Sequence, residues 1–353
     1  TKFASFSGWI NAIIPILIVP YYSVIGGWVI KYLFEYLKGD AKLLATDTYF
    51  SNFISNGVST EICFILFTLF TLAIIYAGVQ NGIERVSKFM MPVLVVLSVI
   101  IAGYSISRPG AFEGVKYFLI PNFDNFSWMT VVSAMGQMFY SLSIAMGILI
   151  TFGSYMKKDV SIEGSTENVE IFDTAIAIMA GLMIIPAVFS FSGGNMETLK
   201  AGPSLMFITI PKVFASMGLG TGIGIIFFLL VLFAAITSSI ALTESAVSTF
   251  QDELHWSRKK STIILGIIMI GLGTLSCLGY GPLSNVTIIG MQFLDFFDFL
   301  TNSVMMPIAA IAICIFVSRV VGLVKVEAEI TKDGNSFKRK KIFNFMIRYL
   351  CPI

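Results

Sequence analysis

Apolar residues run along this chain in long blocks that short polar or charged segments separate. The blocks cover residues 9–37, 61–79, 89–107, 128–155, 173–192, 222–250, 261–280 and 290–322. A helix needs roughly 20 apolar residues to cross the hydrocarbon core of a bilayer. The pattern therefore predicts an all-α polytopic membrane protein with about eight transmembrane helices, in a single transmembrane domain over residues 1–353.

Two segments depart from the simple spanning length. Residues 205–217 are apolar but too short to span, so we expect them to form a helix that lies against the bundle. Residues 222–250 are long enough to tilt in the bilayer or to project from it.

The composition agrees with a lipid environment. Hydrophobic residues make up 56% of the chain and charged residues 12%, against about 25% charged in a typical soluble domain. No block of basic residues alternates with aromatic ones, so we expect the lipid bilayer and no nucleic acid as a partner.

The basic residues divide unequally between alternate connections. One side carries 14 of them: Arg85, Lys88, Lys157, Lys158, Arg258, Lys259, Lys260, Arg319, Lys325, Lys332, Lys338, Arg339, Lys340 and Lys341. The other side carries 6: Lys38, Lys42, Arg108, Lys116, Lys200 and Lys212. Because cytoplasmic loops are rich in Lys and Arg, we expect a multi-pass protein of the cell membrane, with its N-terminal end and the 319–341 loop in the cytoplasm.

The residues that usually bind metals or form catalytic centres are sparse. Four cysteines lie in or beside apolar blocks without metal-ligand spacing, which is typical of packing residues. His255 is the only histidine and lies outside the blocks. An intramembrane serine hydrolase would lack a base, so we expect no enzyme and no organic cofactor.

A run of hydroxyl groups interrupts the block at 222–250. Thr237, Ser238 and Ser239 are consecutive, and the carbonyl of Ala234 lies one helical turn before Ser238. Such oxygens suit a small hard cation. The alternative is that the hydroxyls bond back to carbonyls of the same helix or pack against a neighbour. Glu244 is interpreted either as a vestibule group or as one member of a pair.

A second polar interruption lies in the block at 128–155. Its polar members are Gln137, Tyr140, Ser141 and Ser143, and the small residues Ala145 and Gly147 follow. This pattern predicts a broken helix near 141–147, whose freed carbonyls and amides are able to bind ions and ligands. The alternative is a continuous helix with a polar packing seam.

Asp173 begins the block at 173–192. As a residue in isolation, it favours an N-terminal helix cap.

The stretch VPYYSVIGGW contributes polar groups and close packing to the first block. Pro20 is expected to kink the helix, and either Tyr21 or Tyr22 is placed to reach a ligand carboxylate. Tyrosines in membrane helices more often pack or lie at the interface. Gly26 and Gly27 allow a neighbouring helix to approach closely.

Eight stretches together resemble the neurotransmitter:sodium symporter family, in its bacterial amino-acid transporter branch. They are PYYSVIGGW, NGIERVSKFMMP, GQMFYSLSIAMG, SYMKKD, AGLMIIPAVFSF, GPSLMFITIP, LFAAITSSIA and QDELHWSRKK. The resemblance implies a leucine-transporter-like inverted-repeat fold with broken helices. It also implies that this chain is a fragment, corresponding to the third through tenth of the family's twelve helices and the start of the eleventh.

The resemblance assigns sodium ligands by position. It places Ala234, Thr237 and Ser238 at one sodium site, and Ser141 and Asp173 at the other. Chloride-dependent members have Asn at the position of Asp173. The resemblance therefore implies sodium as the coupling ion and no requirement for chloride.

The resemblance also assigns the substrate pocket and the gates. Tyr22 matches the contact to the substrate carboxylate, and Tyr140 matches the aromatic lid. The other pocket positions are Ile18, Ser141, Ser143, Ala145, Met146, Ser238, Ser239, Ala241 and Leu242. Tyr155 and Asp252 match the cytoplasmic gate, and Asp295 is the choice for the extracellular acid, with Asp298 close behind.

The uncharged pocket predicts a neutral, apolar or aromatic amino acid, imported with sodium by alternating access. Two alternatives stay open: a sodium-coupled transporter of another solute such as an osmolyte or amine, and a non-transporting membrane interaction protein. A homodimer is also left open. Because the family's first helix supplies about half of each sodium site, the chain by itself is expected not to transport.

Overall fold

The structure is a computed structural model that describes residues 2–195, 202–332, 334 and 336–352. Lys200, which was counted on the side poor in basic residues, lies outside these residues. The described residues are helical apart from turns and one isolated bridge between Ile288 and Met291.

The helices follow one another along the chain with short connections. In order they are α1 (Lys2–Lys38), α2 (Ala41–Leu44), α3 (Tyr49–Ser55), α4 (Gly57–Tyr76), η1 (Val79–Glu84), α5 (Arg85–Ile106), α6 (Ala111–Leu119), η2 (Phe123–Asn125), α7 (Trp128–Ser141), α8 (Ile148–Ser154), α9 (Ile162–Ser192), η4 (Leu205–Thr209), α10 (Ile210–Ala215), α11 (Gly220–Leu254), α12 (Arg258–Leu278), α13 (Phe293–Asp298), η5 (Phe299–Met305), α14 (Met306–Ile315), η6 (Phe316–Gly322), α15 (Leu323–Ile330), α16 (Lys340–Phe345) and η7 (Met346–Leu350).

Seven helical stretches among the described residues are long and apolar enough to cross a membrane. They are Lys2–Lys38, Gly57–Tyr76, Val79–Ile106, Ile162–Ser192, Gly220–Leu254, Arg258–Leu278 and Phe293–Ile330. The eighth predicted block is present as α7 and α8, which are separated by residues 142–147 and are each too short to span. The all-helical membrane architecture predicted from the sequence is therefore confirmed.

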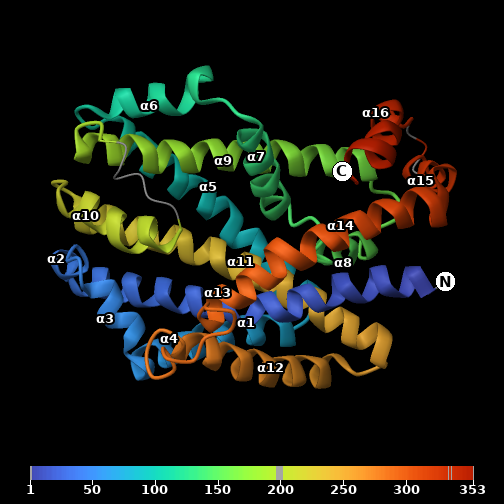
Figure 1. The fold of residues 1–353 in the computed structure, drawn as a ribbon, viewed down its shortest axis with the longest axis horizontal. Coiled ribbons are helices and arrows are strands. Elements are labelled where there is room, and N and C mark those ends of the chain that lie inside the picture. Colours follow the sequence, from blue (N-terminus) through green and yellow to red (C-terminus); the bar gives the residue numbers. More distant parts are fainter. Residues whose placement is uncertain (1, 196–201, 333, 335, 353) are drawn as a thin grey trace.

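The long helices lie roughly side by side. Figure 1 shows α1, α9, α11 and α12 running along the long axis, with α5 crossing obliquely between α9 and α11. The N-terminus, α15 and α16 lie at one end, and α2, α6 and α10 lie at the other. The polar connections are thereby sorted to two opposite ends, as a bundle that crosses a bilayer requires.

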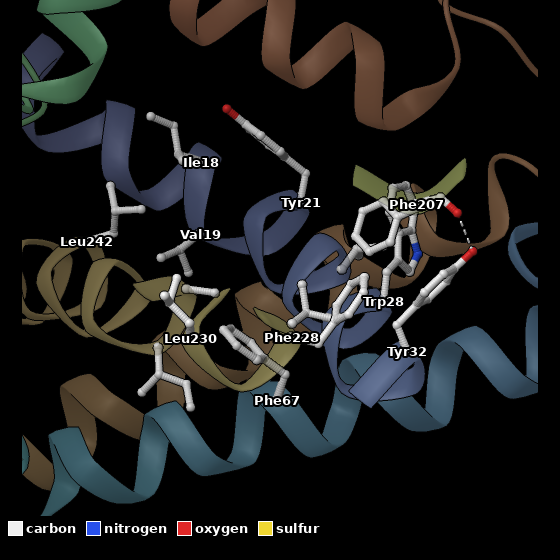
Figure 2. Close-up of a cluster of buried hydrophobic side chains, with 14 of the residues drawn as sticks. Ile18, Val19, Tyr21, Trp28, Tyr32, Phe67, Phe207, Phe228, Leu230 and Leu242 are labelled. Atoms are coloured by element: carbon white, nitrogen blue, oxygen red, sulfur yellow. Dashed lines mark hydrogen bonds between the residues drawn. The ribbon is translucent and has the colours of Figure 1, made fainter. Parts of the chain in front are cut away.

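Helix α1 is the centre of the packing and contacts α4, α11 and α12. Its aromatic side chains meet those of the short helices, as Figure 2 shows around Trp28 and Tyr32. The Tyr32 hydroxyl donates to the carbonyl of Phe207 at 2.8 Å, and the Phe207 ring lies 5.8 Å from that of Trp28. The short apolar segment of η4 and α10 is therefore docked on the bundle, as predicted.

Two adjacent glycines let α4 approach α1. A Cβ atom on Gly26 would lie 2.5 Å from the Phe67 ring, and one on Gly27 would lie 2.7 Å from the backbone nitrogen of Phe64. A ring is able to turn aside, but a helix backbone has to move as a whole. The close approach predicted from these glycines is confirmed, and Gly27 is the stricter of the two.

We predict that Gly27→Ala destabilises the protein by about 1–3 kcal/mol, because the added methyl group overpacks the contact between α1 and α4. The matched control is Gly8→Ala in the same helix, where a new Cβ meets nothing within 4 Å. Thermal unfolding of the two purified variants in the same detergent measures the difference. Equal melting temperatures would show that the close approach does not limit stability.

Candidate functional site

The helix that begins at Trp128 stops in the middle of its membrane block. Helix α7 ends at Ser141 and α8 begins at Ile148, so the break predicted near 141–147 is confirmed and the continuous helix is wrong. Three residues in it have left-handed backbones: Ser143 with φ 54°, Ala145 with φ 61° and Gly147 with φ 73°. For L-residues such angles cost of order 1–3 kcal/mol each, so the surrounding structure has to hold them.

Helices α1 and α11 hold the break in place. A Cβ atom on Gly147 would lie 2.9 Å from the carbonyl oxygen of Asn11 and 2.8 Å from the Ser245 hydroxyl. Only glycine fits between these two helices in a left-handed conformation. The amides of residues 145–147 donate no hydrogen bond to any other described residue, which leaves them available to a ligand.

A cavity of about 740 Å³ lies beside the break, within the size range of small-molecule sites. It gathers these residues predicted from the sequence: Tyr22, Tyr140, Ser141, Ser143, Met146, Thr237, Ser238, Ala241 and Leu242. The residues that sequence reasoning did not name as pocket walls are Ile83, Ser87, Met91, Gln137, Ile148, Phe152, Val169 and Ile240. The cavity therefore lies between α1, α5, the broken helix, α9 and α11.

Five of the residues assigned to the substrate pocket or the sodium sites do not line this cavity: Ile18, Ala145, Asp173, Ala234 and Ser239. Ile18, Ala145 and Ser239 are buried, and Ala234 lies one turn before Ser238. The Ser239 hydroxyl accepts from Thr71 at 3.2 Å and so faces α4. Successive residues of a helix point about 100° apart, so Ser238 and its neighbour face different partners.

Ser141 and Asp173, assigned to one sodium site, are in direct contact. The Ser141 hydroxyl donates to Asp173 Oδ1 at 2.5 Å, joining the end of α7 to the middle of α9. The alternative role of Asp173 as a helix cap is wrong, because α9 begins at Ile162 and its cap is Ser161, whose side chain accepts from Gly164 N. The polar residues 162–172 are part of α9 and extend the helix beyond the apolar block that begins at Asp173.

The oxygens assigned to the other sodium site are partly drawn together. Thr237 Oγ1 donates to the carbonyls of Ala234 at 3.0 Å and of Phe233 at 3.1 Å. The back-bond that the sequence left open as an alternative therefore forms. It also places two of the assigned ligands within hydrogen-bonding distance, while Ser238 lines the cavity beside them.

Glu244 is paired, which settles the two interpretations that the sequence allowed. Its side chain is fully buried and accepts from Arg258 Nη2 at 2.5 Å, Arg258 Nη1 at 3.0 Å and Tyr155 Oη at 2.7 Å. Arg258 Nε also donates to the carbonyl of Ile75 at 2.8 Å. Sequence reasoning missed Arg258, although a buried acid in a span requires a partner and the α11–α12 turn brings this arginine within reach.

Asp252, which the resemblance assigns together with Tyr155 to the cytoplasmic gate, has surroundings of its own. It lines a second cavity of about 300 Å³ with Trp9 of α1 and with Thr151 and Ser154 of α8. Tyr155 is not among the residues that line this cavity. Among the described residues, the structure therefore joins Tyr155 to Glu244 and not to Asp252.

The two acids considered for the extracellular gate have different surroundings. Asp295 accepts from the Tyr280 hydroxyl at 2.9 Å. Burial, followed by the nearby Asp295 carboxylate, raises the pKa of Tyr280 above its ordinary value. Asp298 accepts from Asn302 Nδ2 at 2.6 Å, and the same nitrogen lies 3.4 Å from the Tyr21 hydroxyl. Asn302 thus links Asp298 to Tyr21 of α1, whereas Asp295 is tied to Tyr280 in the loop after α12.

We predict that Glu244→Ala destabilises the protein by about 3–5 kcal/mol, because it removes the counter-charge of Arg258 and leaves the Arg258 Nη groups and the Tyr155 hydroxyl without their acceptor. Glu84→Ala is the control, since Glu84 forms an exposed pair with Lys88, and we expect no resolved change in melting temperature. Thermal unfolding in detergent compares the two. A Glu244→Ala protein as stable as the control would show that the buried network contributes nothing.

Comparisons with known proteins converge on one family. Residues 42–353 match the model described as the sodium:neurotransmitter symporter family. An uncharacterized sodium-dependent transporter YhdH of Bacillus subtilis (strain 168) is 33% identical over 351 residues, with 98% of this chain and 77% of that protein covered. An uncharacterized sodium-dependent transporter of Haemophilus influenzae is 32% identical over 364 residues, covering 100% and 78%. The crystal structure of MhsT in complex with L-phenylalanine superposes with a TM-score of 0.84 at 36% identity, covering 98% and 78%.

Proposed function

This chain belongs to the sodium:neurotransmitter symporter family, a family of sodium-coupled membrane transporters, and from this premise we propose that its cargo is a neutral, apolar or aromatic amino acid. The observation that carries the proposal is the lining of the cavity beside the break. Its 17 lining residues are apolar, hydroxyl-bearing or amide side chains, and none is charged. A charged substrate side chain would lose its hydration there without gaining a partner.

The backbone and hydroxyl groups around the cavity suit the two charges of an amino acid. The free amides of residues 145–147 and the Tyr22 hydroxyl are donors for a carboxylate. The hydroxyls of Ser141 and Ser143 are acceptors for an ammonium group. The similar structure of MhsT holds L-phenylalanine, which supports an aromatic amino acid as a cargo of suitable size.

The proposed sodium ligands have the chemistry that a small hard cation prefers. They are the hydroxyl of Ser141 with the carboxylate of Asp173, and the oxygens of Ala234, Thr237 and Ser238. Asp173 supplies a fixed negative charge next to the broken helix. A second anion is then unnecessary to balance the bound cation, and for this reason we propose transport without chloride.

The position of the break supports transport by alternating access. The cavity lies beside it, and the contact between Tyr155 and Glu244 ties α8 to α11 on one side. Movement of the broken helix and of the helices it touches would expose the cavity to one end of the bundle at a time. The excess of Lys and Arg in alternate connections supports placing the N-terminal end and the 319–341 loop in the cytoplasm.

We predict that the protein from its natural gene binds L-phenylalanine only in sodium. Scintillation-proximity binding of tritiated L-phenylalanine, in sodium and then in potassium at equal ionic strength, measures this. L-Leucine and L-tryptophan should compete. L-Glutamate and L-lysine should not, because the cavity offers no charged partner for their side chains. The osmolyte betaine should not compete either, because the proposed contacts are those of an amino-acid backbone. If only betaine or a simple amine competed, the cargo would be an osmolyte or an amine and not the proposed neutral amino acid.

We predict that Asp173→Asn makes sodium-driven uptake depend on chloride. The unmodified protein from the natural gene should transport equally in chloride and in gluconate, whereas its variant should lose at least about tenfold in gluconate, the equivalent of roughly 1.4 kcal/mol. Glu167→Gln, a charge removal on the same helix α9, is the control and should behave like the unmodified protein. A requirement of the unmodified protein for chloride would contradict the proposal.

A further inference from the structure

Asn302 lies in the last spanning stretch, in the π-helical segment η5 that directly follows Asp298. π-helical turns occur frequently at functional sites. The Asn302 nitrogen Nδ2 donates to Asp298 Oδ1 at 2.6 Å and lies 3.4 Å from the Tyr21 hydroxyl oxygen. Asn302 therefore joins one of the two acids considered for the extracellular gate to helix α1.

The hydrogen bonds around Asn302 agree on the orientation of its amide. An ionised carboxylate only accepts, so the group that faces Asp298 has to be the NH₂. Thr301 Oγ1 donates to the carbonyl of Phe297 at 2.8 Å, which makes the Tyr21 hydroxyl the donor in its 3.3 Å contact with Thr301. The Tyr21 oxygen is then available to accept from Asn302. These bonds form one relay that ties α13 and η5 to α1.

Tyr21 is a fixed anchor for this relay. Its side chain is only 1% exposed, and in Figure 2 its hydroxyl points away from the aromatic cluster around Trp28. The next residue, Tyr22, lines the substrate cavity and is the proposed contact of the substrate carboxylate. The relay therefore meets α1 one residue away from the substrate contact.

The aromatic ring of Tyr140 connects Asn302 to the substrate cavity. Tyr140 and Asn302 both line a small cavity of about 270 Å³, together with Phe139 and Met306. Tyr140 also lines the substrate cavity of about 740 Å³. The ring that the resemblance assigns as the lid thus borders both spaces, and a displacement of η5 from α1 would change the wall beside it.

We propose that Asn302 is a positioning residue for closure of the substrate cavity toward the extracellular end. By holding the Asp298 carboxylate and the Tyr21 hydroxyl together, it keeps η5 against α1 and the Tyr140 lid in place. The inference rests on the proposed transport of an amino acid, since closure retains a bound cargo. The contact with Asp298 contributes most, because a hydrogen bond to a charged group is stronger than one between neutral groups.

The test measures dissociation of tritiated L-phenylalanine, in sodium, from the protein of the natural gene. Leucine has the branched shape of asparagine without its hydrogen bonds, so Asn302→Leu should dissociate about tenfold faster, the equivalent of roughly 1.4 kcal/mol. Asn52→Leu, the same change at an exposed position of α3, is the matched control and should dissociate like the unmodified protein. An unchanged rate in Asn302→Leu would overturn the proposal.

Asn302→Asp supplies a signature that a merely structural defect lacks. Two carboxyl groups in contact share a proton, so the tie to Asp298 should persist at low pH and fail as the pH rises. The dissociation rate of this variant, relative to the unmodified protein, should therefore increase between about pH 5 and pH 9. The relative rate of Asn302→Leu should stay constant. A relative rate of Asn302→Asp that does not change with pH would contradict the proposal. All variants keep the other titratable groups around Asp298, which are Asp295, Tyr21, Tyr140 and Tyr280.

Hydrogen–deuterium exchange without substrate separates this inference from the proposed cargo. Asn302→Leu should increase exchange of the backbone amides of η5, and Asn52→Leu should leave them unchanged. If the unmodified protein did not bind L-phenylalanine, the proposed cargo would be wrong, and the exchange would still decide whether Asn302 holds η5 against α1. Unchanged exchange in Asn302→Leu would overturn the inference.

Discussion

A helix that breaks inside a bilayer leaves backbone groups that lipid is unable to solvate, so protein has to surround the break. Residues 142–147 meet this constraint by lying against α1 and α11, with Gly147 close to the carbonyl of Asn11 and the hydroxyl of Ser245. The strained backbones of Ser143 and Ala145 persist because these two long helices are themselves fixed. Met146 lines the cavity beside the break, and the amides of residues 145–147 donate no hydrogen bond to any other described residue. These amides are the donors that we propose for the substrate carboxylate.

The rigidity of α1 and α11 comes from contacts that a membrane protein is able to use. Lipid gives no hydrophobic driving force between helices, so close packing and internal hydrogen bonds have to hold them together. Gly27 brings α4 against α1, and Ser239 of α11 accepts from Thr71 of α4. One face of α11 thereby packs against α4. Thr237, Ser238 and Ala241 remain on the face that lines the cavity.

The sequence predicted the architecture well because its strongest signals are local. The length of each apolar block predicted a membrane-spanning helix, and the cluster of polar and small residues at 137–147 predicted the broken helix. The left-handed angles at Ser143 and Ala145 carry no such signal, since L-residues adopt them only under tertiary constraint. The start of α9 was missed for a related reason. Its first turns are polar, so hydropathy ends at Asp173 although the helix reaches back to Ile162.

The candidate site was predictable in its membership but not in its pairings. The resemblance assigns Tyr155 and Asp252 to one gate but does not name Glu244, whose carboxylate accepts from the Tyr155 hydroxyl because helix α8 is short and its end lies against the middle of the polar stretch of α11. Ile18 and Ser239 show the same difficulty. A residue's place in a motif does not say which way it points, and a rotation of about 100° per residue moves a wall position into the scaffold.

The ion pair of Glu244 and Arg258 leaves the end of α8 held by a hydrogen bond alone, which suits the movement of the broken helix that we propose. A buried ion pair is weak evidence for stability in itself, since apolar residues of similar volume often serve as well. Here the two charges lie on α11 and α12 and satisfy each other, and Tyr155 adds one hydrogen bond from α8. Release of α8 then breaks a hydrogen bond to a charged group, about 1.5–3 kcal/mol. It does not expose an unpaired buried charge, which would cost about 3–5 kcal/mol. The hydrogen bond from Tyr155 would therefore hold α8 in one state while the ion pair of Glu244 and Arg258 stays intact. Opening it would cost an amount of free energy that binding of sodium and substrate is able to offset.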